Sequence, residues 1–371
     1  MKVVIALNTA WNLVNFRTGL IRALVAKGYE VVAVAPEDEY AFKLDLLRCR
    51  FVALPMDNKG TNPIRDLLLF FRFFRMLRRE RPDVFLGYTI KPNVYGSLAA
   101  HALGVPVVNN IAGLGSVFMR DTWLTRLVRL LYKSALSRSD HVFFQNNEDL
   151  QMFVERGLVA SNKVSRLPGS GINLTAFPFT PSKSLSESPL VFLLVARLLW
   201  DKGVGEYVEA ARIIHRQYPN VKFQLLGFLD VANPTAVTST EMHDWVNEGV
   251  VEYLGVTDDV KPYIVAADVI VLPSYREGVP RSLLEAAAIG RPIVTTDAIG
   301  CRDAVDDGVN GFLCNIRDAD GLAEKMIRMV ELSSSDRIAM GAAGRAKMEK
   351  EFDEKIVIDR YLEVVKTITR T

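Results

Sequence analysis

The chain has 371 residues, a formal net charge of +2 and 49% hydrophobic residues. This length is too great for one ordinary core and suits two domains of common size, while the near-neutral charge argues against a general nucleic-acid binder. The cysteine pattern argues against a disulfide framework or a zinc-type site, because no spaced pair occurs among Cys49, Cys301 and Cys314. A reducing cytosol is the expected compartment.

The first half of the chain alternates short apolar runs with longer segments of helical spacing. Such runs are typical of parallel strands covered by helices on both faces. The run at 3–7 is too short for a signal-peptide core or a membrane span, and the run at 67–77 is interrupted by Arg72 and Arg75. The expected strands are VVIAL (3–7), VVAVA (31–35), DVFLG (83–87), PVVNN (106–110) and HVFFQ (141–145).

Two predicted helices of this half, at 63–82 and 121–139, combine basic residues with large apolar ones. Such helices can lie on an anionic membrane surface, where each basic residue contributes about 1 kcal/mol. The alternative is an ordinary amphipathic helix that packs on its sheet and leaves one face in water. We expect membrane association through Arg65, Arg72, Arg75 and Arg79 in the first helix and Arg126, Arg129 and Lys133 in the second.

A polar stretch rich in proline and serine, at 177–189, precedes a second series of apolar strands. We therefore predict an α/β fold with two doubly wound domains, at 1–176 and 177–353. The last helix, at 354–371, could fold with either domain. The second series comprises LVFLLVA (190–196), KFQLLG (222–227), VEYLG (251–255), DVIVLPS (268–274) and PIVTT (292–296).

Arg197 and Lys202 follow the first strand of this second series, just before a helix that begins near Gly203. Open α/β sheets bind ligands at the carboxyl ends of their strands, where helix N-termini offer unpaired N–H groups. A guanidinium that binds two oxygens and an ammonium that adds a point charge suit a diphosphate. The alternative is a pair of solvated surface cations.

Glu277 and Glu285 follow the strand at 268–274, the first in a loop and the second in a helix. The backbone N–H groups between Gly278 and Ser282 could face the same anion as Arg197 and Lys202. Glu285 could then accept hydrogen bonds from a ribose diol, and Glu277 could meet hydroxyls on the group that the diphosphate carries. The alternative for Glu285 is a favourable interaction with the helix dipole, of roughly 0.3–1 kcal/mol.

Familiar cofactor motifs are missing from the sequence. The segment GLGSVF at 113–118 lacks the last glycine of G-x-G-x-x-G, and no phosphate-binding P-loop motif occurs, which argues against a dinucleotide dehydrogenase or a P-loop enzyme. The Asp-x-Asp match at 318–320 directly precedes a predicted helix, so we interpret it as a helix cap and not as a magnesium or manganese site.

These features together resemble glycosyltransferase family 4, whose members are retaining enzymes of the GT-B architecture. The resemblance implies two Rossmann-like domains that face one another across a cleft, and it covers most of the chain. The stretches that carry it are NFRTGLIRALVAKGYEV (15–31), TIKPNVYGSLAA (89–100), SGINLTAF (170–177), VARLLWDKG (195–203), SYREGVPRSLLEAAAIGRPIVTTD (274–297) and DDGVNGFL (306–313).

The resemblance implies a role for each residue of the Arg, Lys, Glu, Glu set. Arg197 and Lys202 would bind the donor diphosphate and stabilise its developing charge, and Glu285 would hold the ribose. Glu277 would hold the donor sugar, helped by the backbone of Gly278 and Val279. The resemblance also implies retention by same-face attack, with no metal ion and no cofactor.

Residues of the first domain are expected on the acceptor side. Asn15 and Phe16 would lie in the loop that follows the first strand, near the diphosphate and the acceptor. Many relatives place a histidine after the third strand, where this chain has Thr89, Ile90 and Lys91. Lys91 is therefore the cation assigned to an acceptor phosphate, with an exposed loop lysine as the alternative. The acceptor-side set also includes Gly113 and Gly115.

The stretches at 89–100 and 111–118 resemble those of bacterial transferases that extend undecaprenyl-diphosphate-linked sugars, including N-acetylgalactosaminyltransferases. We therefore expect a UDP-sugar donor, a lipid-linked saccharide acceptor, no nucleic-acid partner, and a cytoplasmic enzyme that is peripheral at the inner face of the plasma membrane. The alternatives are another UDP-hexose or a soluble acceptor, a nucleotide-sugar epimerase, and a binding protein that keeps the fold without catalysis.

Overall fold

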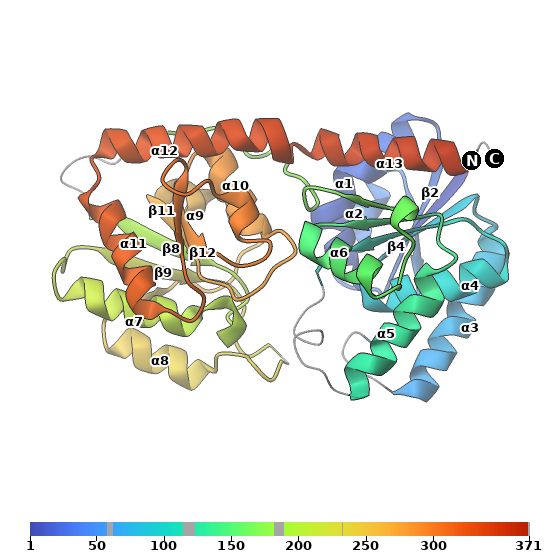
Figure 1. The fold of residues 1–371 in the computed structure, drawn as a ribbon, viewed down its shortest axis with the longest axis horizontal. Helices are drawn as coiled ribbons and strands as arrows, with labels where there is room; N and C mark the ends of the chain where they lie inside the picture. The colour runs from blue at the N-terminus through green and yellow to red at the C-terminus, as the bar shows by residue number, and fades with distance from the viewer. Residues whose placement is uncertain (58–61, 114–122, 182–188, 232, 370–371) are drawn as a thin grey trace. The chain divides into compact units, whose positions relative to one another are not determined.

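A computed structural model describes residues 1–57, 62–113, 123–181, 189–231 and 233–369, and of residues 123–127 only the backbone. The chain divides into two compact units. Unit 1 comprises Met1–Ser170 and Glu354–Thr371, and unit 2 comprises Gly171–Asp353. In each unit a central sheet carries helices on both sides (Figure 1).

The sheet of unit 1 has seven strands in the order β3-β2-β1-β4-β5-β6-β7, and every neighbouring pair is parallel. In β1, an interior strand of this sheet, Val3 and Ile5 enter one core cluster and Val4 and Ala6 another. Burial on both faces explains why the sequence shows continuous apolar runs and not alternation. The strands are β1 (Lys2–Ala6), β2 (Glu30–Ala35), β3 (Arg50–Ala53), β4 (Val84–Tyr88), β5 (Val107–Ile111), β6 (His141–Phe144) and β7 (Val164–Arg166).

The helices of unit 1 connect these strands. Thr9 caps the first helix, because its side chain accepts a hydrogen bond from the backbone N–H of Asn12. Asn62 caps α3 in the same way through the N–H groups of Ile64 and Arg65, and Pro63 starts that helix. The helical segments are α1 (Ala10–Ala26), α2 (Phe42–Asp45), α3 (Pro63–Glu80), η1 (Pro92–Gly96), α4 (Ser97–Ala102), α5 (Trp123–Leu136), α6 (Asn147–Glu155) and η3 (Ser161–Lys163).

The last helix, α13 (Glu354–Ile368), belongs to unit 1. Val357, Tyr361 and Val365 recur every four residues and are buried in the same core cluster as α1. The Tyr361 hydroxyl accepts a hydrogen bond of 2.9 Å from the Asn110 amide at the end of β5. Its ring centroid lies 4.7 Å from that of Phe143 in β6, so α13 closes one face of the first sheet.

The sheet of unit 2 has six parallel strands in the order β10-β9-β8-β11-β12-β13. Phe192 and Leu194 of β8 face one core cluster and Leu193 faces another. The strands are β8 (Val191–Val195), β9 (Lys222–Leu226), β10 (Glu252–Tyr253), β11 (Val269–Leu272), β12 (Ile293–Thr296) and β13 (Gly311–Cys314). The longer helices are α7 (Val204–His215), α8 (Ser239–Asn247), α9 (Lys261–Ala266), α10 (Arg281–Ile289), α11 (Ala319–Glu331) and α12 (Ser334–Lys347).

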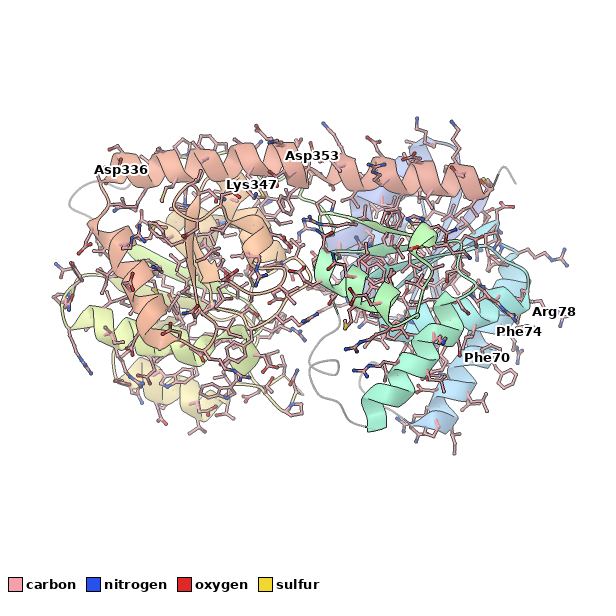
Figure 2. All side chains as sticks on the ribbon, in the orientation of Figure 1. Phe70, Phe74, Arg78, Asp336, Lys347 and Asp353 are labelled. Atoms are coloured by element: carbon pink, nitrogen blue, oxygen red, sulfur yellow. The ribbon has the colours of Figure 1, made fainter. Side chains whose placement is uncertain are left out.

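The boundary between the units differs from the sequence-based one. Residues 171–176 belong to unit 2, because Ile172 is buried in a core cluster of that unit and its N–H donates a 2.8 Å hydrogen bond to the Phe352 carbonyl. The domain expected at 1–176 therefore ends at Ser170. Figure 2 marks Asp336 near the start of α12, and Lys347 and Asp353 where the helical run of this unit ends.

Candidate functional site

Two loops meet at the carboxyl edge of the second sheet, because the strands β8 and β11 that precede them are neighbours. The N–H of Tyr275 donates a 3.0 Å hydrogen bond to the Asp201 carbonyl. Gly203 has a φ of 73°, and a Cβ atom there would lie 2.2 Å from the Pro273 carbonyl oxygen. Only glycine permits this close approach, so the sequence fixes the two loops against each other at this point.

The contact between these loops joins two of the predicted site residues. The Lys202 ammonium forms an ion pair with the Glu277 carboxylate, and both side chains are only 16% exposed. The backbone of Glu277 is held by a 2.9 Å hydrogen bond from its N–H to the Ile299 carbonyl. Lys202 and Glu277, which are distant in sequence, thus lie at one place on the sheet edge.

Arg197 lies in the first of these loops and is exposed. In the part of the chain that the structure describes, its guanidinium has no ion-pair or hydrogen-bond partner, so it is available to a ligand. Beside it, the N–H of Leu198 donates a 3.0 Å hydrogen bond to the carbonyl of Phe228, a residue that is 51% exposed. Sequence analysis did not single out Phe228, an exposed aromatic residue two positions after the end of β9.

Glu285 lies on α10, which follows the second loop. Its carboxylate pairs with Arg281 one turn earlier, at 2.8 Å between Oε1 and Nε. Burial raises the pKa of Glu285, and the neighbouring Arg281 opposes that rise. The structure therefore pairs Glu285 with Arg281 and not with the cations of the other loop.

The start of α10 offers unpaired donors. Its N-cap is Pro280, which supplies no capping side chain. Among the described residues, the backbone N–H groups of Gly278, Val279 and Ser282 donate no hydrogen bond. A helix N-terminus with free N–H groups near Lys202 can bind an anion such as a phosphate.

The first unit has its own cavity, of about 660 Å³, near the carboxyl ends of β2 and β3, with basic, acidic and apolar residues on its walls. Basic side chains on its walls come from Arg65, Arg72 and Lys91. Lys91 is mostly buried and pairs with Asp66 at 2.8 Å, while the Tyr95 hydroxyl donates to the second oxygen of Asp66 at 2.9 Å. The ammonium group of Lys91 is therefore fixed by Asp66, and Lys91 is not an exposed lysine in a loop.

The expected loop position of Asn15 and Phe16 is wrong. Both lie inside α1, because Thr9 starts the helix at Ala10 and leaves only a short loop after β1. The Asn15 amide donates a 2.9 Å hydrogen bond to the Trp11 carbonyl, and the Phe16 ring packs edge-on against Trp11. Gly113 has a φ of 116° after β5, whereas Gly115 lies outside the described residues.

The residues expected to associate with a membrane lie on α3 and α5, and both of these helices contact η1. Arg65 pairs with Asp57 at 3.1 Å, and Arg72 donates a 2.7 Å hydrogen bond to the Pro55 carbonyl. On α3, Arg75 and Arg79 are exposed. On α5, Arg129 is partly buried and Lys133 is exposed, while the side chain of Arg126 lies outside the described part of the structure. No helix in the described ranges has the length and apolar character to cross a bilayer.

The Asp-x-Asp match at 318–320 caps a helix, as predicted. Asp318 is the N-cap of α11, and its carboxylate accepts a 2.8 Å hydrogen bond from the N–H of Gly321. The position of the Asp318 carboxylate is thus explained by its role as a helix cap.

Family comparisons cover both units. Residues 15–169 match the family described as glycosyl transferase 4-like domain, and residues 189–331 match glycosyl transferases group 1. A curated relative from Campylobacter jejuni, N,N'-diacetylbacillosaminyl-diphospho-undecaprenol alpha-1,3-N-acetylgalactosaminyltransferase, is 30% identical over 367 residues and 94% of each chain. An Escherichia coli relative, UDP-Gal:alpha-D-GlcNAc-diphosphoundecaprenol alpha-1,3-galactosyltransferase, is 26% identical over 77% of this chain and 76% of its own.

The fold is also similar to solved structures. Sucrose-phosphate synthase from Thermosynechococcus elongatus superposes with a TM-score of 0.81, covering 99% of both chains at 18% sequence identity. At that identity the likeness concerns the fold alone, and it agrees with two α/β units that each contain a parallel sheet.

Proposed function

The chain belongs to glycosyltransferase family 4 and has the GT-B architecture, and from that premise we propose that it transfers an N-acetylhexosamine, GalNAc or GlcNAc, from a UDP-sugar to an undecaprenyl-diphosphate-linked saccharide. The observation that carries this proposal is the Lys202–Glu277 pair at the carboxyl ends of β8 and β11. This pair supports the proposal because it holds together the cation that we propose to bind phosphate and the carboxylate that we propose to bind the sugar. The similarity to the two lipid-linked transferases supports the acceptor class.

On the donor side, Arg197 and Lys202 bind the diphosphate. Arg197 is exposed and supplies two donors in a fork, whereas Lys202 is held by Glu277 and supplies a fixed positive charge. The free N–H groups at the start of α10 add to this anion site. Together they stabilise the negative charge that grows on the diphosphate as the sugar leaves.

The two glutamates hold the two ends of the donor. Glu277 accepts hydrogen bonds from the sugar hydroxyls, with its carboxylate oriented by Lys202 and with backbone support from Gly278 and Val279. Glu285 accepts from the ribose hydroxyls in its ionised form. Phe228, exposed beside Arg197, offers a face on which the nucleobase can stack.

We propose that the transfer retains the configuration at the anomeric carbon. UDP-hexoses carry their diphosphate in α linkage, and both relatives are named for α-1,3 products. The bond from C1 to the diphosphate oxygen breaks, the bond from C1 to the acceptor oxygen forms on the same face, and the acceptor proton passes to the leaving phosphate oxygen. No carboxylate nucleophile is required, so Glu277 remains free to bind sugar hydroxyls.

No metal ion is needed in this scheme, because Arg197 and Lys202 supply positive charge at the diphosphate. Asp318 of the Asp-x-Asp match is occupied as a cap of α11.

On the acceptor side, the cavity lined by Arg65, Arg72 and Lys91 binds the diphosphate of the lipid-linked saccharide. Asp66 holds Lys91 in place, so the cation is positioned before the acceptor arrives. Because such an acceptor is anchored in a bilayer, the enzyme works at the inner face of the cytoplasmic membrane.

A transfer assay tests the proposal. The protein is incubated with UDP-GalNAc, UDP-GlcNAc, UDP-galactose or UDP-glucose and with a prenyl-diphosphate acceptor that carries one N-acetylated sugar, and products are identified by mass spectrometry. We expect one UDP-N-acetylhexosamine to be used, with activity lost in Glu277→Ala. Conversion of a UDP-sugar into another UDP-sugar without acceptor would instead indicate an epimerase, and no reaction with any donor would contradict the proposal.

A further inference from the structure

A pocket of about 330 Å³ on unit 2 has walls that the donor and acceptor sites do not use. It lies where α7, α8 and the start of α11 come together on one side of the second sheet, and these helices share one core cluster (Figure 1). Among the described residues, neither Lys202 nor Glu277 lines it. Small-molecule sites have volumes of about 300–1,000 Å³. The pocket therefore has room for a small ligand.

Two tryptophans form the aromatic wall of this pocket. The rings of Trp200 and Trp245 lie edge to face, with 5.9 Å between their centroids, and Trp200 is 37% exposed. Gly205 leaves space for the Trp200 ring, because a Cβ atom at this glycine would lie 2.5 Å from Cζ3 of the ring. A large aromatic side chain that stays exposed in a pocket suits a ligand with an apolar ring face.

The polar wall includes a carboxylate oxygen that lacks a partner. Oε1 of Glu206 accepts a 2.6 Å hydrogen bond from the Tyr275 hydroxyl, which fixes the carboxylate. Oε2 of Glu206 is buried and, within the described residues, accepts no hydrogen bond. Burial and the bond to Glu206 raise the pKa of Tyr275, so its hydroxyl stays a donor at neutral pH. Because a buried acceptor without a donor is unfavourable, Oε2 marks a position for a donor from a ligand.

Arg317 adds a cation to the polar wall. It is exposed just before α11, and its guanidinium carbon lies 4.8 Å from the centroid of the Tyr275 ring. Its backbone has a φ of 56°, which is uncommon for a residue other than glycine. In the part of the chain that the structure describes, Arg317 has no ion-pair partner, so its N–H groups are available to a ligand. Glu209, also on the wall, already pairs with Arg212.

These walls discriminate between classes of ligand. A cationic ligand would be repelled by Arg317, and an anionic ligand would be repelled by Glu206. A neutral ligand with several hydroxyls can donate to Glu206 and accept from Arg317 in charge-assisted hydrogen bonds. The carbon-bound hydrogens of a pyranose ring also form an apolar face, which the negative face of an aromatic ring attracts. The walls therefore suit a neutral saccharide.

We infer that this site, the α7–α11 pocket (Trp200, Gly205, Glu206, Trp245 and Arg317), binds a pyranose ring of a saccharide. The tryptophans contact the apolar face of the ring, Glu206 accepts from its hydroxyls and Arg317 donates to its oxygens. Saccharide binding here goes beyond the proposed function and does not rest on it, because these contacts require no transfer reaction.

A saccharide in this pocket would lie next to the loops of the donor site. Tyr275, whose hydroxyl fixes Glu206, is two residues before Glu277. The Tyr275 N–H also donates to the Asp201 carbonyl, which holds the two loops together. The pocket can therefore retain a glycan chain beside the place where the donor is proposed to bind.

The experiment is a ligand-observed NMR titration of the full chain with methyl glycosides of N-acetylgalactosamine, N-acetylglucosamine, galactose and glucose. Saturation transfer should reach the ring protons of at least one glycoside, with a Kd in the millimolar range because one ring covers little area. Trp200→Ala should weaken this binding by about tenfold or more, and Trp200→Phe should restore part of it.

Two polar variants test the other wall. Glu206→Gln keeps an acceptor for Tyr275 but replaces the free oxygen by a donor, so binding should weaken by about tenfold or more. Arg317→Gln should also weaken binding, and because this side chain is exposed, the variant still tests the pocket if Trp200→Ala fails to fold.

Matched controls change the same chemistry elsewhere on unit 2. Phe179→Ala removes an aromatic side chain with a similar exposure of 39%, and Glu324→Gln removes an exposed carboxylate of α11. Both controls should bind the glycoside like the unmodified chain. Equal binding by the pocket variants and the unmodified chain, equal losses in the controls, or no saturation transfer to any glycoside would overturn the inference.

Two further readouts separate the pocket from other sites and ligands. Loss of glycoside binding in Glu277→Gln, with binding retained in the pocket variants, would assign the sugar to the donor site and overturn the inference. Saturation transfer to choline and to no glycoside would assign the pocket to a cation, with the same consequence. Failure of the unmodified chain to bind UDP, with the glycoside titrations as expected, would refute the proposed function and leave the saccharide pocket intact.

Discussion

Arg197 and Lys202 are expected to bind the same diphosphate, yet their replacement by alanine should have different effects on stability. Arg197 is exposed and has no partner within the described residues, so Arg197→Ala should change the free energy of unfolding by no more than about 0.5 kcal/mol. Lys202→Ala leaves the mostly buried Glu277 carboxylate without its cation. That loss should cost about 1–3 kcal/mol, which lowers the Tm of a unit of this size by roughly 2–12 °C.

Both variants should bind UDP less well. A hydrogen bond to a charged group contributes about 1.5–3 kcal/mol, so each replacement should raise the Kd for UDP by about 10- to 150-fold. Calorimetric titration measures the Kd and differential scanning calorimetry the Tm, with the exposed Arg216→Ala on the same unit as control. A Kd for Arg197→Ala within twofold of the unmodified chain, or equal losses of Tm in both variants, would refute the assignment.

Three further predictions concern the same unit. Glu277→Gln should lower the transfer rate by about 100-fold or more while UDP still binds, because the carboxylate meets the sugar and not the nucleotide; an unchanged rate would remove Glu277 from the site. Affinity for a UDP-sugar should fall as the pH drops through the pKa of Glu285, which burial raises above the ordinary 4.5, since protonation removes the negative charge and turns one of the two acceptor oxygens into a donor. Titrations over a pH series should show this loss in the unmodified chain and not in Glu285→Gln. Gly203→Ala should lower the free energy of unfolding, measured with urea, more than Gly249→Ala does. Both glycines have a positive φ, but only at Gly203 would a Cβ atom lie within 4 Å of another atom.

The sheets could be predicted from sequence because their strands are buried on both faces. The expected run at 3–7 corresponds to β1 at Lys2–Ala6, and the expected run at 190–196 corresponds to β8 at Val191–Val195. The position of Lys202 at a strand end followed directly from that pattern. The pairing of Lys202 with Glu277 could not be predicted from that pattern. The strands β8 and β11 that precede these residues are neighbours in the sheet, but β9 and β10 lie between them in the sequence.

Other features depend on contacts that periodicity does not reveal. Apolar residues occur all around α3, so the sequence could not say that Leu69 and Phe73 face the core while Leu67 and Phe71 face outward. Asn15 was misplaced because the stop of β1 and the start of α1 are separated by a very short loop. Thr9 is the one signal for that start, and no glutamate follows it three residues later to complete a capping box.

The place of α13 in unit 1 has a consequence for the order in which the chain matures during synthesis. Unit 2 is one continuous segment, so it can fold as soon as it leaves the ribosome. The core of unit 1 is completed by Tyr361 and its neighbours, which follow unit 2 in the sequence and contact Phe143 and Asn110. A chain that ends within unit 2 would therefore carry a first sheet whose core is uncovered around Phe143, so the unit proposed to bind the acceptor is completed only after the unit proposed to bind the donor has been synthesised.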